Sequence, residues 1–192
     1  PNAMRGGPMF EFLFGIDTLL RQQNRREQFE LIFFSPAEQP GNRLGEKAYR
    51  MLSSMIDRRE ITPRLGKKLL GFSENSITTA GGEFKSDLTL FMPGITGQEW
   101  FDNTELPRSA GGMIRADEHC KVADHERVFV AGDAGSFPGP AWLPKQAHMA
   151  DLQAAAAAKN LLAELYGNQV VATFRPELIC VIDSLDSGVL VN

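Results

Sequence analysis

One short run constrains the fold of this chain more than any other part of its sequence. The apolar residues Val128 to Ala131 have the character of a buried strand, and Gly132-Asp133 follows them directly. After a loop, Lys145 to Tyr166 is expected to form a long helix, because it contains five consecutive alanines, the residue with the strongest helix propensity. In α/β folds, a carboxylate at the carboxyl end of a parallel strand projects into the crevice where ligands bind. The run therefore predicts an α/β protein with a ligand site after this strand.

The first half of the chain alternates between helical and strand patterns, as a layered α/β unit does. Apolar residues recur at helical spacing from Pro8 to Gln23 and from Gly45 to Arg58, and the apolar strand Phe29 to Phe34 lies between them. We therefore expect a three-layer unit. Short segments of strand character follow and indicate a small β meander that returns to a buried strand: Ile61-Thr62, Lys68 to Phe72, Ser76 to Thr79 and Phe84 to Met92. Two more short strands are expected in the tail, Glu177 to Ile182 and Val189 to Val191.

Composition excludes several classes of function. With 192 residues, 43% of them hydrophobic and 23% charged, the chain can bury a sizeable core. Its net charge is −4 and its 20 lysines and arginines are dispersed, so no basic patch favours a nucleic-acid partner. No apolar run reaches the roughly 20 residues that a membrane-spanning helix needs, and no signal-peptide pattern opens the chain. We therefore expect a soluble, cytoplasmic protein.

The cysteines and histidines do not form a metal-binding pattern. Cys120 and Cys180 stand far apart without CxxC spacing, which indicates neither a zinc site nor a disulfide framework. His119, His125 and His148 share no ligand spacing, so no metal is expected. His148 could carry protons, although a histidine on a helix more often packs or faces solvent.

The segment after Asp133 decides how this aspartate is interpreted. Taken alone, Gly132-Asp133 would be a turn, because aspartate commonly caps one. Here the loop contains Gly135 and Gly139 and leads into Pro144-Lys145-Gln146-Ala147, the start of the long helix. A helix start is electropositive and suits a carbonyl oxygen or an anion, such as the pyrimidine ring of a reduced flavin. Together the two motifs favour a ligand site over a simple turn, and Gly132, having no Cβ, would let the ligand approach the backbone closely.

These motifs carry a resemblance to a known family. The strand ending in Asp133, the helix start and the alanine-rich helix resemble the second flavin motif of the pyridine nucleotide-disulfide oxidoreductase superfamily. Within it, they are most similar to sulfide:quinone oxidoreductases. Gly7 to Phe12 is similar to that family's Gly-Pro-Ala-Tyr-Glu-Phe segment, and Glu177 to Asp183 is similar to its cysteine-bearing C-terminal strand.

The resemblance implies particular site residues. Gly132 and Asp133 would hold the ribityl chain of FAD, and Lys145, Gln146 and Ala147 would face the isoalloxazine ring.

The family has two redox cysteines, and this chain matches only one of them. The stretch Met4 to Gly7 lacks the redox cysteine that the family has there. Cys180 matches the other redox cysteine, whose thiolate would attack the sulfur of sulfide or form a flavin adduct. Cys180 could equally be a small buried residue between Ile179 and Val181. Both interpretations stay open.

The resemblance also implies a domain organisation. The fold class is α/β: a Rossmann-like three-layer unit without its first strand, a small β meander and half of an FAD-binding domain. Residues 4–105 would be the NAD(P)-binding-like Rossmann domain, residues 106–167 the C-terminal half of the FAD-binding domain, and residues 168–192 the start of a C-terminal quinone-side segment. Because Pro1-Asn2-Ala3 before Met4 is typical of a cloning remnant, we expect a piece of a longer protein. The glycine loop for the FAD pyrophosphate would lie upstream, so this piece alone is expected to bind no FAD and to be inactive.

The function implied for the parent protein is electron transfer from sulfide, or a related reductant, through FAD to quinone. NAD is not expected, because the strand that begins at Phe29 leads to Ser35 rather than to an acidic residue. A type II NADH:quinone dehydrogenase and a non-catalytic homologue that acts as an interaction module are the alternatives. Peripheral membrane association and a homodimer through an exposed sheet edge are further expectations. An apolar quinone mouth could be lined by Phe137, Pro138 and Trp142.

Overall fold

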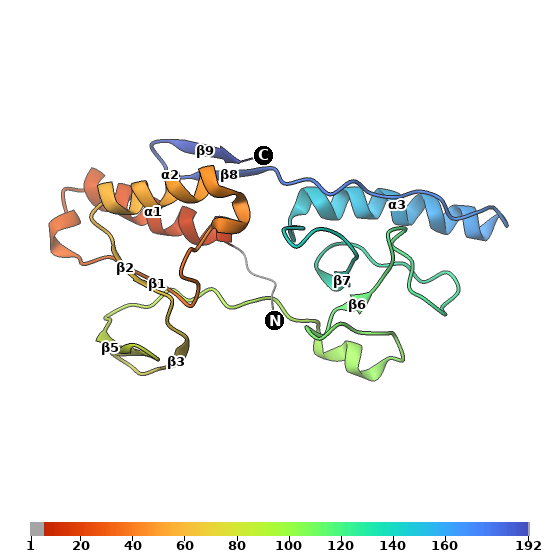
Figure 1. Ribbon diagram of the computed structural model, residues 1–192, viewed down its shortest axis with the longest axis horizontal. Helices are drawn as coiled ribbons and strands as arrows, with labels where there is room; N and C mark the ends of the chain where they lie inside the picture. The colour runs from red at the N-terminus through yellow and green to blue at the C-terminus, as the bar shows by residue number, and fades with distance from the viewer. Residues whose placement is uncertain (1–5, 192) are drawn as a thin grey trace. The chain divides into compact units, whose positions relative to one another are not determined.

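The computed structural model describes residues 6–191, which divide into two compact units. The first unit comprises Gly6–Met92 and Cys180–Val191, and the second comprises Pro93–Ile179. Figure 1 shows both units and labels their α-helices and most of their strands. These boundaries differ from the expected domain boundaries, because the break falls at Met92 rather than near residue 105. The tail hairpin also packs with the first unit rather than forming a segment of its own.

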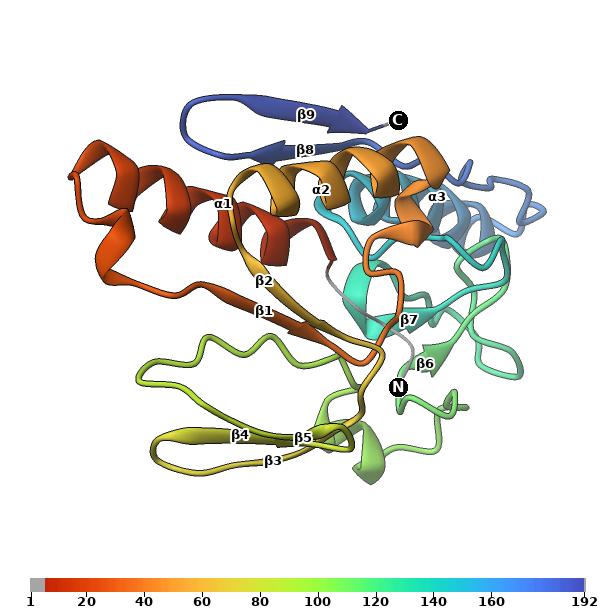
Figure 2. The same cartoon turned by 60° about the vertical axis from the view of Figure 1, so that its left-hand side comes forward.

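The first unit is built in layers around a short parallel sheet. β1 (Ile32–Ser35) pairs with β2 (Thr62–Leu65) in parallel, with Ile32 opposite Thr62. Helices α1 (Gly6–Gln22) and α2 (Glu46–Arg58) cover one face of this sheet, and the antiparallel meander lies on the other (Figure 2). The meander consists of β3 (Leu69–Phe72), β4 (Ser76–Thr79) and β5 (Gly82–Lys85). The hairpin of β8 (Cys180–Asp183) and β9 (Gly188–Val191) packs on α1, and the short 3₁₀ helices η1 (Arg26–Gln28) and η2 (Asn42–Leu44) lie in the connections.

Alternating side chains of β1 join these layers. Phe33 is buried against Phe10 of α1, with ring centroids 5.4 Å apart. Its neighbour Phe34 points to the opposite face, where its ring lies 6.1 Å from that of Phe84 in the meander. Successive residues of a strand face opposite sides of a sheet, so this one strand serves two apolar layers. The predicted layered α/β unit with a meander is confirmed.

The prediction of a buried strand from Phe84 to Met92 is wrong. β5 ends at Lys85, and beyond it Leu88 is 79% exposed and Leu90 is 60% exposed. The Oγ atom of Ser86 donates a hydrogen bond to the carbonyl of Leu88, a local bond that competes with sheet pairing. The alternating apolar pattern thus marks an extended segment that no described strand covers.

The second unit is built on one long helix. α3 (Ala147–Leu165) packs against loops that contain the short parallel pair β6 (Ile114–Arg115) and β7 (Gly135–Ser136). Two 3₁₀ helices complete the unit, η3 (Glu99–Asn103) and η4 (Gly132–Ala134). Its apolar core gathers residues from the loops and short strands, namely Phe101, Ile114, Ala116, Val122 and Val130.

The strand that the sequence predicted from Val128 to Ala131 is only partly formed. Among the described residues, its one bridge joins Phe129 to Lys121 in antiparallel orientation. Backbone bonds from Val122 N to Val128 O and from Val130 N to Cys120 O make it the second arm of a hairpin. The expected parallel strand is therefore wrong. Among the described residues, this segment pairs in antiparallel orientation with the segment that immediately precedes it, as the second arm of a hairpin does.

Buried amide side chains tie α3 to its surroundings. Asn160 is 1% exposed, and its Nδ2 donates to the carbonyls of His119 at 2.9 Å and Ala172 at 2.7 Å. Its Oδ1 accepts from Ala172 N at 2.9 Å. One side chain thus holds both the loop before the hairpin and the extended segment after α3.

None of the helices described between residues 6 and 191 is long and apolar enough to cross a membrane.

Candidate flavin-binding site

The second unit brings together the five residues that the flavin motif predicted. Gly132 and Asp133 form the first turn of η4, and Ala147 is the first residue of α3. The side chain of Lys145 reaches back from the helix start to η4 and donates to the carbonyl of Asp133 at 3.2 Å. The strand end and the helix start therefore adjoin, as the predicted site requires.

Gly132 occupies a position that only glycine fills without strain. Its φ angle is +66°, in the left-handed region, and a Cβ there would lie 3.1 Å from the Cβ of Ala150 in α3. Its amide N donates to Oε1 of Gln153 at 2.8 Å, and Gln153 is 3% exposed. The backbone of η4 is thus fixed directly against the first two turns of α3.

The side chain of Lys145 connects the helix start to the η4 loop through two hydrogen bonds. In addition to its bond to Asp133, its Nζ donates to the carbonyl of Gly135 at 2.6 Å. These contacts neutralise carbonyl dipoles at the end of η4 and hold the loop in its turn. The resemblance assigned Lys145 to the isoalloxazine ring. The structure gives its ammonium group a positioning role as well.

The start of α3 retains hydrogen-bonding capacity. Gln146 is the N-cap residue, but its side chain makes no capping bond, and its Oε1 is buried without a hydrogen-bond partner. A buried acceptor without a donor is costly, by about 1–3 kcal/mol. The first amides of a helix have no partners within the helix either. Donors and an unused acceptor at one helix start match the alternating carbonyl and N–H edge of a flavin pyrimidine ring, so these residues fit FAD.

Cys180 lies in the first unit, on β8, where it faces α1. Its Sγ is 3.0 Å from the position that a Cβ on Gly7 would occupy, so this sulfur fills the space beside a helix glycine. Burial, followed by the nearby carboxylate of Glu11, raises the pKa of the Cys180 thiol. A raised pKa lowers the thiolate fraction that a nucleophile needs. This environment favours the packing interpretation, and the catalytic assignment stays a prediction.

Sequence reasoning missed two contributors to this region. Gln153 and Glu177 were not singled out, although Gln153 anchors Gly132 and Glu177 contacts the first turn of α3. His148 Nε2 lies 2.8 Å from Glu177 Oε2, and Glu177 N donates to Sδ of Met149 at 3.3 Å. The spacing of Met149, Gln153, Ala156 and Asn160 along one helix face could have identified Gln153 as buried.

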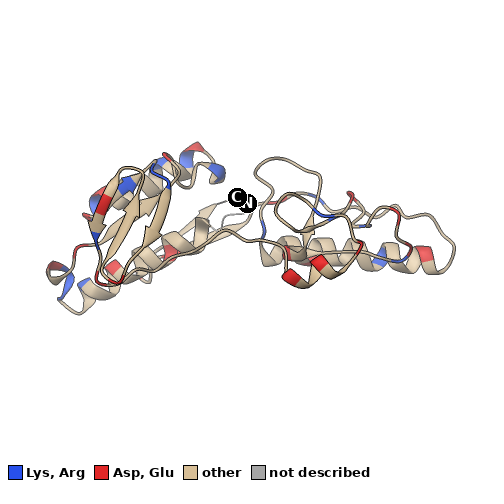
Figure 3. Cartoon of the chain, turned by 90° about the horizontal axis from the view of Figure 1, so that it is seen from below, with Lys and Arg blue, Asp and Glu red and all other residues tan. Residues whose placement is uncertain are grey.

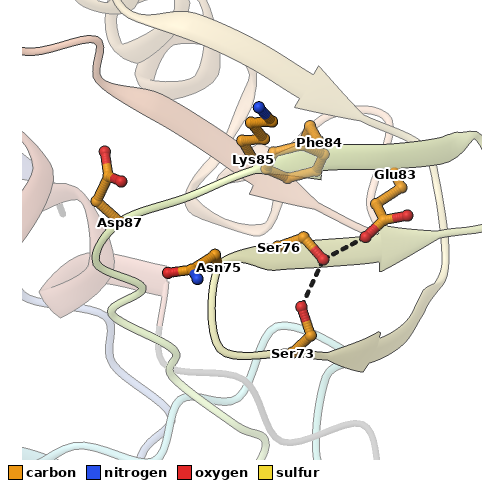
Figure 4. A pocket seen from close by; sticks show the side chains of 7 residues that line it. All are labelled: Ser73, Asn75, Ser76, Glu83, Phe84, Lys85 and Asp87. Atoms are coloured by element: carbon orange, nitrogen blue, oxygen red, sulfur yellow. Dashed lines mark hydrogen bonds between the residues drawn. The ribbon is translucent and has the colours of Figure 1, made fainter.

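Other polar features offer weaker candidates. An open pocket on the meander is lined by Ser73, Ser76, Glu83 and neighbouring residues (Figure 4). There Ser73 Oγ lies 2.6 Å from Ser76 Oγ, which also donates to Glu83, as expected for a hairpin turn that satisfies its own groups. Charged residues of both signs are interspersed within each unit (Figure 3). Among residues 6–191, no three metal-ligating side chains gather closely enough to hold an ion.

Comparison with solved structures confirms the predicted fold. The sulfide:quinone oxidoreductase of the hyperthermophilic bacterium Aquifex aeolicus superposes with a TM-score of 0.84 over 99% of this chain, at 18% identity. A chain of the Tetrahymena thermophila mitochondrial ATP synthase matches with a TM-score of 0.63 over 89% of this chain, at 16% identity. An engineered water-forming NADPH oxidase bound to NADPH matches with a TM-score of 0.58 over 77%, also at 16% identity.

These similarities establish the Rossmann-like α/β fold. This chain spans about half of the first of these proteins, 48% of its length, and 42% and 34% of the other two. No protein-family model matches the sequence, and no curated protein is significantly similar to it.

Proposed function

We propose that this chain forms part of an FAD-dependent oxidoreductase and supplies the contacts to the flavin ring and ribityl chain. The observation that carries the proposal is the start of α3. There, an N-cap glutamine has a buried acceptor without a partner, beside the first amides of the helix and next to an η4 turn whose glycine cannot bear a side chain. When bound, FAD would supply two-electron redox chemistry.

The residues present would divide the work of holding the cofactor. The carboxylate of Asp133 would accept hydrogen bonds from ribityl hydroxyls, and Gln146 would accept from a ring N–H. The amides of the first turn of α3, beginning at Ala147, would donate to a ring carbonyl and stabilise negative charge on the ring. Lys145 and Gln153 would keep η4 and the helix start in register.

For the substrates, we propose sulfide or a related reductant as the electron donor and a quinone as the acceptor. The support is the sequence resemblance together with the extent of the match to the Aquifex aeolicus enzyme. Phe137 packs edge-on against Phe174, with ring centroids 5.5 Å apart, so it belongs to the packing of the second unit. Trp142, which is 42% exposed, is the better candidate for an apolar quinone contact.

One alternative has an observation in its favour. The raised pKa of the Cys180 thiol weakens it as a nucleophile, and a chain of the Tetrahymena assembly has the same fold. A non-catalytic homologue that acts as an interaction module would have both properties. Peripheral membrane association and pairing of two copies through a sheet edge remain proposals for either case.

The proposal is tested by flavin absorbance of the protein that contains this chain. We expect FAD to be retained through gel filtration and bleached by sulfide but not by NADH. Bleaching by NADH alone would favour the type II dehydrogenase, and a colourless protein would favour the interaction module. Asp133→Asn is expected to weaken FAD binding about tenfold, the value of a charge-assisted hydrogen bond. Asp124→Asn is the matched control, because Asp124 is an exposed aspartate in another loop of the same unit.

A further inference from the structure

The outer edge of β1 carries unused hydrogen-bonding groups. Thr62 N donates to Leu31 O, and in the parallel register that this bond sets, the backbone of Phe33 also faces β2. The N–H and C=O groups of Ile32 and Phe34 therefore point the other way. Among residues 6–191, β2 is the only strand that pairs with β1, and no described hydrogen bond reaches these groups. Edge strands are ordinarily protected by charged residues or proline, and β1 has neither.

Helix α1 presents a wider apolar face than the strands beneath it cover. Its buried Phe10 packs on Phe33 of β1, and the tail hairpin covers another side, where Leu185 lies 3.7 Å from the position of a Cβ on Gly15. A helix is roughly 10 Å wide and neighbouring strands are about 4.8 Å apart, so α1 extends past the edge of β1. A further apolar stripe at helical spacing is only half-buried, namely Met9, Leu13, Ile16 and Leu20.

The extended segment of residues 88–92 contacts β1 from the meander side. The ring of Phe91 stacks on that of Phe34, with centroids 6.5 Å apart and planes inclined by 10°. Leu88 and Leu90, in the same segment, are exposed. This segment, β1 and the half-buried stripe of α1 contain no charged residue, although 23% of the chain is charged. The free edge of β1 thus combines backbone donors and acceptors with uncharged surfaces on both faces of the sheet.

We propose that this edge binds an extended apolar segment of another polypeptide as an added strand. A peptide backbone in the extended conformation carries donors and acceptors at the spacing that the edge requires, and such strand addition is a general mode of peptide recognition. The stripe of α1 would cover one face of the added strand and residues 88–92 the other. A strand covered on both faces is apolar at consecutive positions rather than at alternate ones. The edge lies in the first unit, so its binding is independent of the flavin site proposed for the second.

A single strand fits this edge better than a second copy of the chain does. Pairing β1 with β1 of another copy would bring the two strands to about 4.8 Å. Because α1 extends past the edge in each copy, the two helices would meet first, since packed helices stand about 8–10 Å apart. A single strand carries no helical layer and can lie beneath α1.

Amide hydrogen exchange in the isotope-labelled chain tests this edge directly. The probe is the peptide acetyl-KVVIVVK-amide, whose consecutive apolar residues suit a strand covered on both faces. We expect it to slow exchange at the amides of Ile32 and Phe34 about tenfold, the value of one hydrogen bond. The amide of Phe33, which faces β2, should not change. Acetyl-KVVPVVK-amide is the matched control, because proline lacks the donor that a ladder needs.

Two substitutions separate the edge from general apolar adhesion. Leu90→Lys places a charge in the covering segment and should weaken binding of the peptide about tenfold, the lower end of the value of burying a leucine. Titration of the exchange effect at Phe34 measures this affinity. Leu70→Lys is the matched control, because Leu70 is 61% exposed and Leu90 is 60% exposed, but Leu70 lies on β3. Unchanged exchange at Phe33 would show that both variants keep the fold.

Several outcomes would overturn the assignment. Unchanged exchange at Ile32 and Phe34 in millimolar peptide would show that the edge takes no strand. Equal slowing by the proline peptide, or equal weakening in Leu70→Lys, would indicate adhesion without strand pairing. Protection of the two amides without peptide, increasing with protein concentration, would assign the edge to a second copy instead. A colourless protein would overturn the proposed flavin site alone, because the exchange measurement needs no cofactor.

Discussion

The two units bury polar side chains in different ways. In the first, the carboxylate of Asp17 is completely buried and accepts bonds from three arginines. In the second, the buried polar groups include the neutral amides of Gln153 and Asn160, which bond to backbone atoms. A buried charge must be matched by opposite charge, whereas an amide needs only donors and acceptors. We therefore expect the first unit to be more sensitive than the second to pH and to the loss of a single charge.

The charged cluster joins segments that are distant in sequence. Arg26 Nε donates to Asp17 at 2.7 Å and Arg59 Nη1 donates to it at 2.8 Å, while Arg21 Nε lies 3.0 Å away. Arg59 also reaches Asp186 in the β8–β9 hairpin, at 3.2 Å. Through these arginines, Asp17 links α1 to the segment at η1 and to the end of α2, and Arg59 extends the link to the tail hairpin.

The largest effect is expected from Asp17→Asn. Removing one partner of a buried ion pair costs about 3–5 kcal/mol, because the arginines are left without their counter-charge. Trp100 and Trp142, the only tryptophans, both lie in the second unit, so tryptophan fluorescence reports that unit while far-UV circular dichroism reports both. In urea, we expect the dichroism transition of the first unit to move to lower concentration and the fluorescence transition to stay in place. A loss below about 1 kcal/mol, the value of a surface pair, would contradict the buried-charge account.

The pH dependence should show the same contrast between the units. Burial acts to raise the pKa of Asp17, but hydrogen bonds from Arg59, Arg21 and Arg26 outweigh it, and the net pKa lies below the ordinary value. A lowered native pKa stabilises the fold fully above the unfolded pKa of about 3.9, and this contribution is lost as the pH falls toward the native pKa. The first unit should thus lose stability in acid more steeply in wild type than in Asp17→Asn. Equal slopes in the two proteins, measured by urea titrations at several pH values, would rule out this linkage.

A smaller effect is expected in the second unit from Asn160→Ala. The substitution removes three hydrogen bonds and takes their Asn160 partner from the partly buried carbonyl of His119 and amide of Ala172, at a cost of about 2 kcal/mol. Tryptophan fluorescence should report the loss at every pH, because no charge is involved. Asn168→Ala, at an exposed asparagine of the same unit, is the control and should have little effect.

The sequence predicted the helices and strands of both units better than it predicted their buried polar side chains, Asp17 in the first unit and Gln153 and Asn160 in the second. Helical spacing located α1 and α2, and the Gly132-Asp133 motif located the candidate site, because both signals are local. Asp17 was missed, since it falls on the same helix face as Phe10 and Phe14, where the pattern predicts an apolar residue. Its burial depends on arginines that approach from other elements, and a single sequence does not show such contacts.

The exposed segment after β5 was missed for a related reason. Leu88 to Met92 has the alternation of a buried strand, but burial requires a neighbouring strand, which is not a property of the segment itself. Gln153 shares a helix face with Met149 and Ala156, but in an alanine-rich helix that face is weakly marked, and a glutamine there would ordinarily face solvent. Its burial follows from the approach of Gly132, whose amide needs an acceptor.

The smallest effect is expected at an exposed ion pair, and it tests whether the first unit depends on Asp17 because of its charge or because that charge is buried. Arg50 Nε and Glu46 Oε1 are 2.8 Å apart on α2, a distance close to that between Arg59 and Asp17, but the two side chains are 74% and 64% exposed. Water and salt screen such a pair, so Glu46→Gln should cost about 0.3–0.5 kcal/mol. The dichroism transition used for Asp17→Asn measures this loss, and added salt should abolish it while leaving the effect of Asp17→Asn largely intact. If Glu46→Gln destabilised the first unit as much as Asp17→Asn does, the charge itself, and not its removal from water, would be what distinguishes this unit from the other.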